Sequence, residues 1–277
     1  MEELWSDIIP RVISIPYKIY KRRYFIQHIY KRIRVFFNAG NTNIVVVGRP
    51  SVGKTVLTKH LNGKITIQTD KPELSSDVEV DVLRLKKWSK IISTIPGQLM
   101  AEREKGLEQA FDRHNELEGV IYVVDWGYTK TWNKLTEREL ISKGITDIKA
   151  LREYNLKTER EDFTHILAKV RQAISNGRGP KWLLIAVNKA DLFYDEIDDA
   201  QKYYDPDFKS EFTNILNNFL DFVGRKNFKC ISLPISCWEE NLTWNTEIIE
   251  TKLGGRENKR ALFLNFHKKL VELSNKQ

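Results

Sequence analysis

One stretch of the chain carries two glycines, a lysine and a threonine at the spacing that binds phosphate. It consists of Gly48, Arg49, Pro50, Ser51, Val52, Gly53, Lys54 and Thr55. This fits Gly-x-x-x-x-Gly-Lys-Ser/Thr, in which the glycines let backbone N–H groups turn inward around a phosphate. Lys54 would supply positive charge to the β- and γ-phosphates, and the Thr55 hydroxyl would ligate Mg²⁺. The loop therefore predicts a nucleotide site. In this site Thr55 would be the metal ligand and Lys54 would be a catalytic residue as well as a phosphate ligand.

A second motif has the residues to select a base. Asn188, Lys189, Ala190 and Asp191 directly follow an apolar run at residues 182–187. A carboxylate can accept hydrogen bonds from both N1–H and the N2 amino group of guanine, and adenine offers no such pair. An ordinary turn or helix cap is the alternative explanation of these four residues. Their place after a strand and downstream of the phosphate loop favours a guanine site.

Both motifs are predicted to follow strands. Residues 43–47 form a short β-branched run, typical of a strand buried on both faces, that leads into the phosphate loop. Further strands are predicted at 78–85, 88–95, 120–124, 182–187 and 230–235, and helices around 101–114, 162–176, 207–223 and 257–274. Because strands that alternate with helices form parallel sheets, we predict an α/β fold. Its mostly parallel sheet would have six strands and helices on both faces.

Together the two motifs resemble those of the Ras-like small GTPases and, in some respects, of their Arf branch. The resemblance covers roughly residues 43–275 and implies a P-loop G domain that binds GTP or GDP with Mg²⁺. By this resemblance Asn188 would contact the purine pocket, Lys189 would lie along the ring, and Asp191 would select guanine. Ser236 and Cys237 resemble the family's Ser-Ala base loop with cysteine in place of alanine, although a plain strand end is the alternative.

The family's catalytic loop, Asp-x-x-Gly-Gln, has a counterpart at residues 94–98. The resemblance implies that Gly97 binds the γ-phosphate through its N–H and that Gln98 orients the attacking water. Thr94 stands in place of the acidic residue that supports Mg²⁺, and a hydroxyl is the weaker partner for metal-bound water. Asp125 would compensate if it faced the metal; otherwise it is a strand-end residue satisfied by backbone N–H groups.

Two functions follow from this departure. One is a switch that hydrolyses GTP slowly, and the other is a GTP-binding scaffold with negligible hydrolysis that acts through a membrane or protein partner. The threonine or serine that would sense the γ-phosphate in the first switch is poorly marked. The candidates are Ser75, Ser76 and Thr69.

The basic charge of the chain is concentrated near its start. Between Ile8 and Thr42 there are eight basic residues and no acidic one, which equals the whole net charge of +8. Apolar and aromatic residues recur there at helical spacing, at Ile26, Tyr30, Ile33 and Phe37. Residues 1–38 are therefore predicted to form a basic amphipathic helix. It could bind an anionic membrane or a protein through residues 8–37, or pack on its own domain; nucleic acid is the least favoured partner.

The remaining residues, 39–277, are predicted to form the G domain, with an insertion at about 126–162. Its aromatic residues Trp126, Tyr128 and Trp132 could anchor a protein partner or pack the insertion back onto the core. Two cysteines are too few for a disulfide framework, and no apolar run reaches the roughly 18 residues that span a bilayer. We therefore expect a cytoplasmic protein with peripheral membrane contact as an option.

Overall fold

The structure is a computed structural model, and it describes residues 43–63, 79–85, 88–95, 100–111, 117–131 and 133–275. Several sequence predictions fall outside these residues. They are the N-terminal helix at 1–38, the first-switch candidates Thr69, Ser75 and Ser76, the catalytic-loop residues Gly97 and Gln98, and Trp132.

The described residues contain a six-stranded sheet in the order β2-β3-β1-β4-β5-β6. Its strands are β1 (Asn43–Val47), β2 (Glu79–Leu85), β3 (Trp88–Thr94), β4 (Leu117–Val124), β5 (Trp182–Val187) and β6 (Lys229–Pro234). The predicted α/β fold with a mostly parallel sheet is confirmed. Its parallel part has five strands rather than six, because β2 pairs antiparallel with β3 at the edge.

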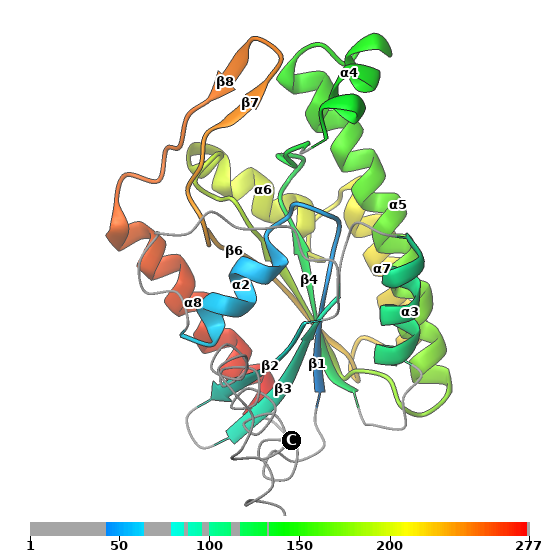
Figure 1. Cartoon of the computed structure of the whole chain (residues 1–277). Helices are drawn as coiled ribbons and strands as arrows, with labels where there is room; N and C mark the ends of the chain where they lie inside the picture. Colours follow the sequence, from blue (N-terminus) through cyan, green and yellow to red (C-terminus); the bar gives the residue numbers. More distant parts are fainter. Residues whose placement is uncertain are drawn as a thin grey trace, which may run out of the picture.

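Helices cover both faces of this sheet (Figure 1). One face carries α2 (Lys54–Leu61) and α8 (Arg256–Asn275), and the other carries α3 (Met100–Phe111), α5 (Ile148–Ser175), α6 (Ile197–Tyr204) and α7 (Glu211–Val223). A short 3₁₀ helix, η2 (Tyr194–Glu196), precedes α6. No helix in the described part of the chain has the length and apolarity needed to cross a membrane.

The two faces of the sheet have separate apolar cores, because successive side chains of a strand point to opposite faces. Val45, Val120 and Leu183 pack under α3, α5 and α7. Ile44, Ile121 and Leu184 pack under α2 and α8. All side chains of β4 and β5 are buried, as expected for central parallel strands. The carboxyl ends of β1, β4 and β5 therefore meet at one edge, where the two sequence motifs follow β1 and β5.

The segment after β4 contains α4 (Lys134–Ser142) and the first half of α5. The expected helix start near residue 162 is wrong, since α5 begins at Ile148 and has 28 residues. Trp126 and Tyr128 are only 8% and 3% exposed, so these two rings pack the segment onto the core. The guanidinium of Arg152 lies 4.3 Å from the Trp126 ring centre and 4.5 Å from that of Tyr128.

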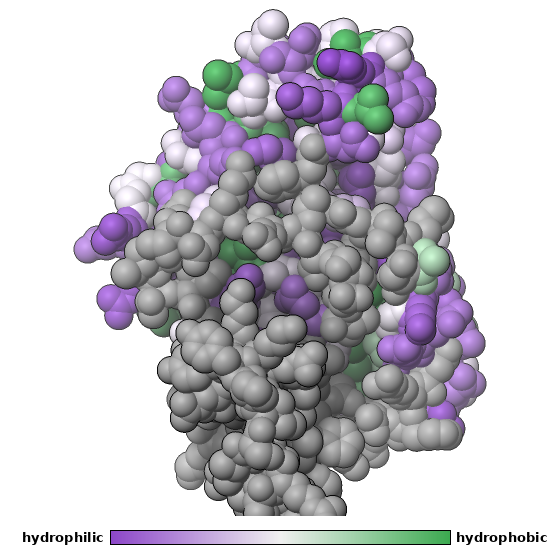
Figure 2. Space-filling model, viewed as in Figure 1, coloured by the Kyte–Doolittle hydropathy of each residue, from purple (hydrophilic) through white to green (hydrophobic). Residues whose placement is uncertain are grey.

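A second irregular segment, which the sequence analysis did not predict, separates β6 from α8. It carries the hairpin of β7 (Leu242–Trp244) and β8 (Glu247–Ile249). The hairpin packs on α4 and the start of α5 around Leu140, Ile148, Leu151 and Trp244. We call α4, the first turn of α5 and this hairpin the insertion lobe. In Figure 2 its surface is mainly hydrophilic, and the hydrophobic residues are isolated from one another.

Candidate nucleotide-binding site

The phosphate loop joins β1 to α2 in a backbone shape that requires glycine. Gly48 and Gly53 have φ angles of +144° and +92°, and Ser51 between them has +65°. A Cβ atom on Gly48 would lie 2.3 Å from the carbonyl oxygen of Val123, and one on Gly53 would lie 2.3 Å from Nδ2 of Asn188. The two glycines thus let the loop approach β4 and the guanine motif more closely than any side chain would permit.

Lys54 is buried inside this loop. Its ammonium donates hydrogen bonds to the carbonyl oxygens of Gly48, at 2.9 Å, and of Arg49, at 2.7 Å. The pKa of Lys54 is lowered to about 7, because burial disfavours the charged form and Arg103 places another positive charge nearby; Asp162 and Asp125 act in the opposite direction. A phosphate in the loop would supply the anion that favours the ammonium.

The first turn of α2 also faces an incoming anion. Gly53 is its N-cap and, within the described residues, no side chain caps the helix. Its first N–H groups therefore stay available, and the helix dipole adds to their attraction for negative charge. The half-buried Thr55 lies in this same turn.

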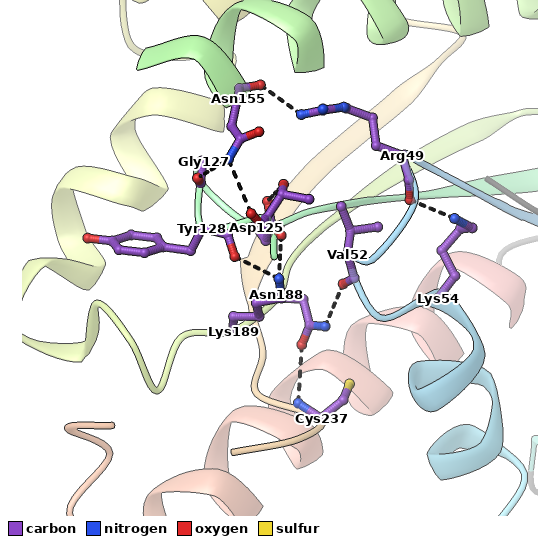
Figure 3. Close-up of polar contacts among 11 residues, drawn as sticks. Arg49, Val52, Lys54, Asp125, Gly127, Tyr128, Asn155, Asn188, Lys189 and Cys237 are labelled. Carbon is purple, nitrogen blue, oxygen red and sulfur yellow. Dashed lines mark hydrogen bonds and ion pairs between the residues drawn. The ribbon is translucent and has the colours of Figure 1, made fainter. Parts of the chain in front are cut away.

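Asn188 joins the guanine motif to the phosphate loop (Figure 3). Its Nδ2 donates to the carbonyl oxygen of Val52 at 2.7 Å, and its Oδ1 accepts from the backbone N–H of Cys237 at 3.1 Å. The side chain thus brings together three of the predicted nucleotide-binding segments, although Val52 and Asn188 are 136 positions apart.

Asp191 is buried with one carboxylate oxygen paired and the other not. Its Oδ1 accepts from the Ser236 hydroxyl at 2.7 Å, whereas its Oδ2 has no hydrogen-bond partner in the part of the chain that the structure describes. Burial raises the pKa of Asp191, and the bond from Ser236 partly opposes that change. An unsatisfied buried acceptor is unfavourable unless a water or a ligand supplies the missing donor.

Lys189 is held by the loop after β4. Its Nζ donates to Oδ2 of Asp125 and to the carbonyl oxygen of Tyr128, each at 2.7 Å. The other oxygen of the fully buried Asp125 accepts from the Thr129 hydroxyl at 2.7 Å. Asp125 is therefore not satisfied by backbone N–H groups alone, because the side chains of Lys189 and Thr129 both donate to its carboxylate.

Thr94 is buried against α2. Its hydroxyl lies 2.8 Å from that of Thr58, which also donates to the carbonyl oxygen of Lys54 at 3.1 Å. Since Thr58 has one hydroxyl hydrogen, Thr94 is the donor of the bond between them. Among the described residues, no group of three or more His, Cys, Asp or Glu side chains could hold a metal ion. Thr55 remains the metal ligand that the sequence predicts.

Part of the chain matches a known protein family. A family model described as "50S ribosome-binding GTPase" matches residues 43–169. The match and the fold confirm the predicted resemblance to P-loop GTPases.

Two solved structures are similar to this chain. The mammalian SRP receptor has 16% sequence identity and a TM-score of 0.46, with 83% of this chain and 99% of that chain covered. The small GTPase Arl6 (BBS3) of Trypanosoma brucei, with the bound nucleotide analogue GppNp, has 12% identity and a TM-score of 0.40, with 83% and 97% covered. Among curated proteins, no sequence matches the chain.

Asn155 also belongs to the surroundings of this site and was not predicted from the sequence; its backbone carbonyl oxygen accepts a hydrogen bond from Nη1 of Arg49 in the phosphate loop. It lies on the buried stripe of α5 formed by Leu151, Asn155, Glu159 and Phe163. Positions four apart share a helix face, so two polar residues on an otherwise apolar stripe were the available signal. The predicted helix begins near residue 162, so Leu151, Asn155 and Glu159 lie outside it and the stripe cannot be recognised.

Proposed function

We propose that this protein is a guanine-nucleotide-binding switch that binds GTP and GDP with Mg²⁺ and hydrolyses GTP slowly. The observation that carries the proposal is the unpaired Oδ2 of Asp191, beside a second oxygen held by Ser236. Guanine has two adjacent donors, N1–H and the N2 amino group, which would satisfy this carboxylate. Asn188 supports the assignment, because it ties the same motif to the phosphate loop at Val52.

In the proposed complex the phosphates lie in the loop of residues 48–55, over the first turn of α2. Lys54 would exchange its two carbonyl partners for the β- and γ-phosphates. Mg²⁺ would be held by the Thr55 hydroxyl and by phosphate oxygens, and it would neutralise charge on the phosphates. Gly97 and Gln98 would contact the γ-phosphate and the attacking water, as the resemblance implies.

A direct test is binding of fluorescent mant-nucleotides to the full chain with Mg²⁺ present. We expect GDP and GTP to bind at least about a hundredfold more tightly than ADP and ATP, because adenine would leave the buried carboxylate unpaired. Equal affinity for ATP would overturn the proposal.

The alternative is a GTP-binding scaffold with negligible hydrolysis. The contact of Thr94 with Thr58 favours it, since that hydroxyl and the Asp125 carboxylate are both hydrogen-bonded to other side chains. Single-turnover hydrolysis of GTP, with and without excess Mg²⁺, separates the two functions. A rate that rises with Mg²⁺ supports the switch, and no product over several hours supports the scaffold.

We further propose a cytoplasmic site of action. A protein partner or an anionic membrane surface would bind through residues 8–37, and a protein partner through the segment 126–162. Flotation with liposomes that contain anionic lipid, compared with neutral liposomes, tests the membrane contact. Equal recovery of the protein with both would exclude it.

A further inference from the structure

Asn155 lies between the phosphate loop and the guanine motif and belongs to neither. It is only 4% exposed, on the buried face of α5. Its backbone carbonyl oxygen accepts a hydrogen bond from Nη1 of Arg49, in the phosphate loop, at 3.0 Å. Its side-chain Nδ2 donates to the carbonyl oxygens of Gly127 at 2.9 Å and Thr129 at 3.3 Å (Figure 3).

The segment bound by Asn155, residues 127–129, is hydrogen-bonded in turn to Lys189. Thr129 donates through its hydroxyl to Asp125, and Lys189 donates both to Asp125 and to the carbonyl oxygen of Tyr128. Figure 3 shows these contacts as one connected set, from Arg49 through Asn155 to Lys189. The phosphate loop and the guanine motif are therefore joined through α5, in addition to their direct contact between Val52 and Asn188.

The segment at residues 125–129 has little freedom to move independently of α5. Gly127 has a φ angle of +83°, and a Cβ atom there would lie 2.9 Å from the carbonyl oxygen of Arg152. The Tyr128 ring stacks on that of Phe193 at 5.6 Å, two residues after the guanine motif. A displacement at Asn155 would thus be passed to both ends of the nucleotide site.

A ligand that is bound at two ends is held tightly only while the two binding elements keep their relative positions, because such preorganisation lowers the entropy lost on binding. We infer that Asn155 is a positioning residue of the proposed nucleotide site, which links Arg49 to Lys189 and thereby slows the release of nucleotide. This inference rests on the proposed function. It adds that Asn155, on α5, controls the rate at which the nucleotide is released.

The test is the dissociation rate of mant-GDP from the Asn155→Ala variant, measured by displacement with excess GDP. Loss of the two donated hydrogen bonds should accelerate dissociation about tenfold. The association rate should stay within about a factor of two, since few affinity changes act on association. An unchanged dissociation rate would overturn the inference.

Tyr204→Phe is the matched control. It also removes one buried hydrogen bond from α5, the 2.7 Å bond from Tyr204 to Glu159, and it removes none of the hydrogen bonds named above between Arg49, Asn155 and Lys189. It should lower the melting temperature and leave mant-GDP dissociation at the wild-type rate. If both variants accelerated release equally, Asn155 would have only a structural role and the inference would be wrong.

Arg49→Met is a second variant. Because Arg49 is only half-buried, its replacement should disturb folding less than the replacement of the buried Asn155. In a double-mutant cycle its effect on dissociation should be smaller in the Asn155→Ala background than in the wild type, since the two residues act through one link. Additive effects would overturn that link. If Asn155→Ala does not fold, an unchanged rate of mant-GDP dissociation from Arg49→Met overturns the inference. A wild-type protein that binds no mant-GDP would instead refute the proposed function, before any variant is compared.

Discussion

The hydroxyl of Thr94 lies 2.8 Å from the hydroxyl of Thr58 and joins the end of β3 to α2. The Thr94 side chain is 2% exposed. Its role in this structure is therefore to hold a helix on the sheet, at the position where the small GTPases carry the acidic residue that supports Mg²⁺.

Replacement of Thr94 by valine tests this role. Thr94→Val keeps the shape and removes one buried hydrogen bond, so it should lower the free energy of unfolding by about 1 kcal/mol in urea titrations. Its effect on the Mg²⁺ concentration needed for half-maximal GTP binding should be small. A marked increase in that concentration would mean that Thr94 supports a metal-bound water.

Asp191→Asn tests the base contact. The amide can present a donor where guanine N1–H also donates, so the affinity for GDP should fall at least about tenfold, and that for xanthosine diphosphate should rise. Competition of both nucleotides against mant-GDP measures the ratio. An unchanged ratio would show that Asp191 does not contact the base.

The affinity for GDP should depend on pH through Lys54. In the nucleotide-free protein the pKa of Lys54 is about 7, and bound phosphate would favour the ammonium. Affinity should therefore be level below about pH 7 and should fall above it, by at most about tenfold per pH unit. Titrations with mant-GDP from pH 6 to 9 measure this profile. Affinity that rises with pH in this interval would contradict the assignment.

The same group affects the stability of the free protein in the opposite direction. Unfolded Lys54 keeps its proton up to its usual pKa of 10.5, whereas folded Lys54 loses it near 7. The unfolded state thus binds more protons between these values, so this contribution to stability rises with pH across that window. Lys54→Met should remove the rise, as urea titrations at pH 7, 8 and 9 would show, and should abolish nucleotide binding.

Glu159 should make the free energy of unfolding decrease with pH, at lower pH values than those at which Lys54 acts. Burial and the charge of Asp125 raise the pKa of Glu159 from 4.5 to about 8, against the hydrogen bond from Tyr204. The folded state then binds more protons, and the contribution to stability is present below about pH 4.5 and is lost as pH rises through 8. Between pH 5 and 7 the wild type should lose up to a few kcal/mol relative to Glu159→Gln, which does not titrate. Equal slopes for the two proteins would show that this carboxyl ionises normally.

The central sheet was predictable because its strands carry a simple pattern. β1, β4 and β5 are short, apolar and buried on both faces, and two of them end in motifs whose spacing requires a sharp turn into a helix or loop. The closeness of Val52 and Asn188 followed from that, since β1 and β5 flank β4 and the carboxyl ends of these parallel strands lie at one edge of the sheet.

The hairpin β7–β8 and the start of α5 escaped prediction for physical reasons. Each strand of the hairpin has three residues, too few to establish an alternating pattern. The indole N–H of Trp244 donates to the carbonyl oxygen of Ile145, 99 positions away. Likewise the partners of Asp125 could not be identified from the sequence, because Lys189 is 64 positions distant and the contact depends on how the loop after β4 turns back.

The start of α5 is capped by Asp147, whose side chain accepts from the backbone N–H of Ala150, and the hairpin adds two further contacts there. The Glu247 carboxylate accepts from the backbone N–H of Ile148 at 2.8 Å, and the indole N–H of Trp244 donates to the carbonyl oxygen of Ile145 at 3.1 Å. Deletion of the hairpin alone would leave that helix end with an unpaired N–H and expose the apolar side chains of Ile148 and Leu151. The hairpin and the start of α5 therefore form one cooperative unit, because each covers apolar side chains of the other and pairs its polar groups.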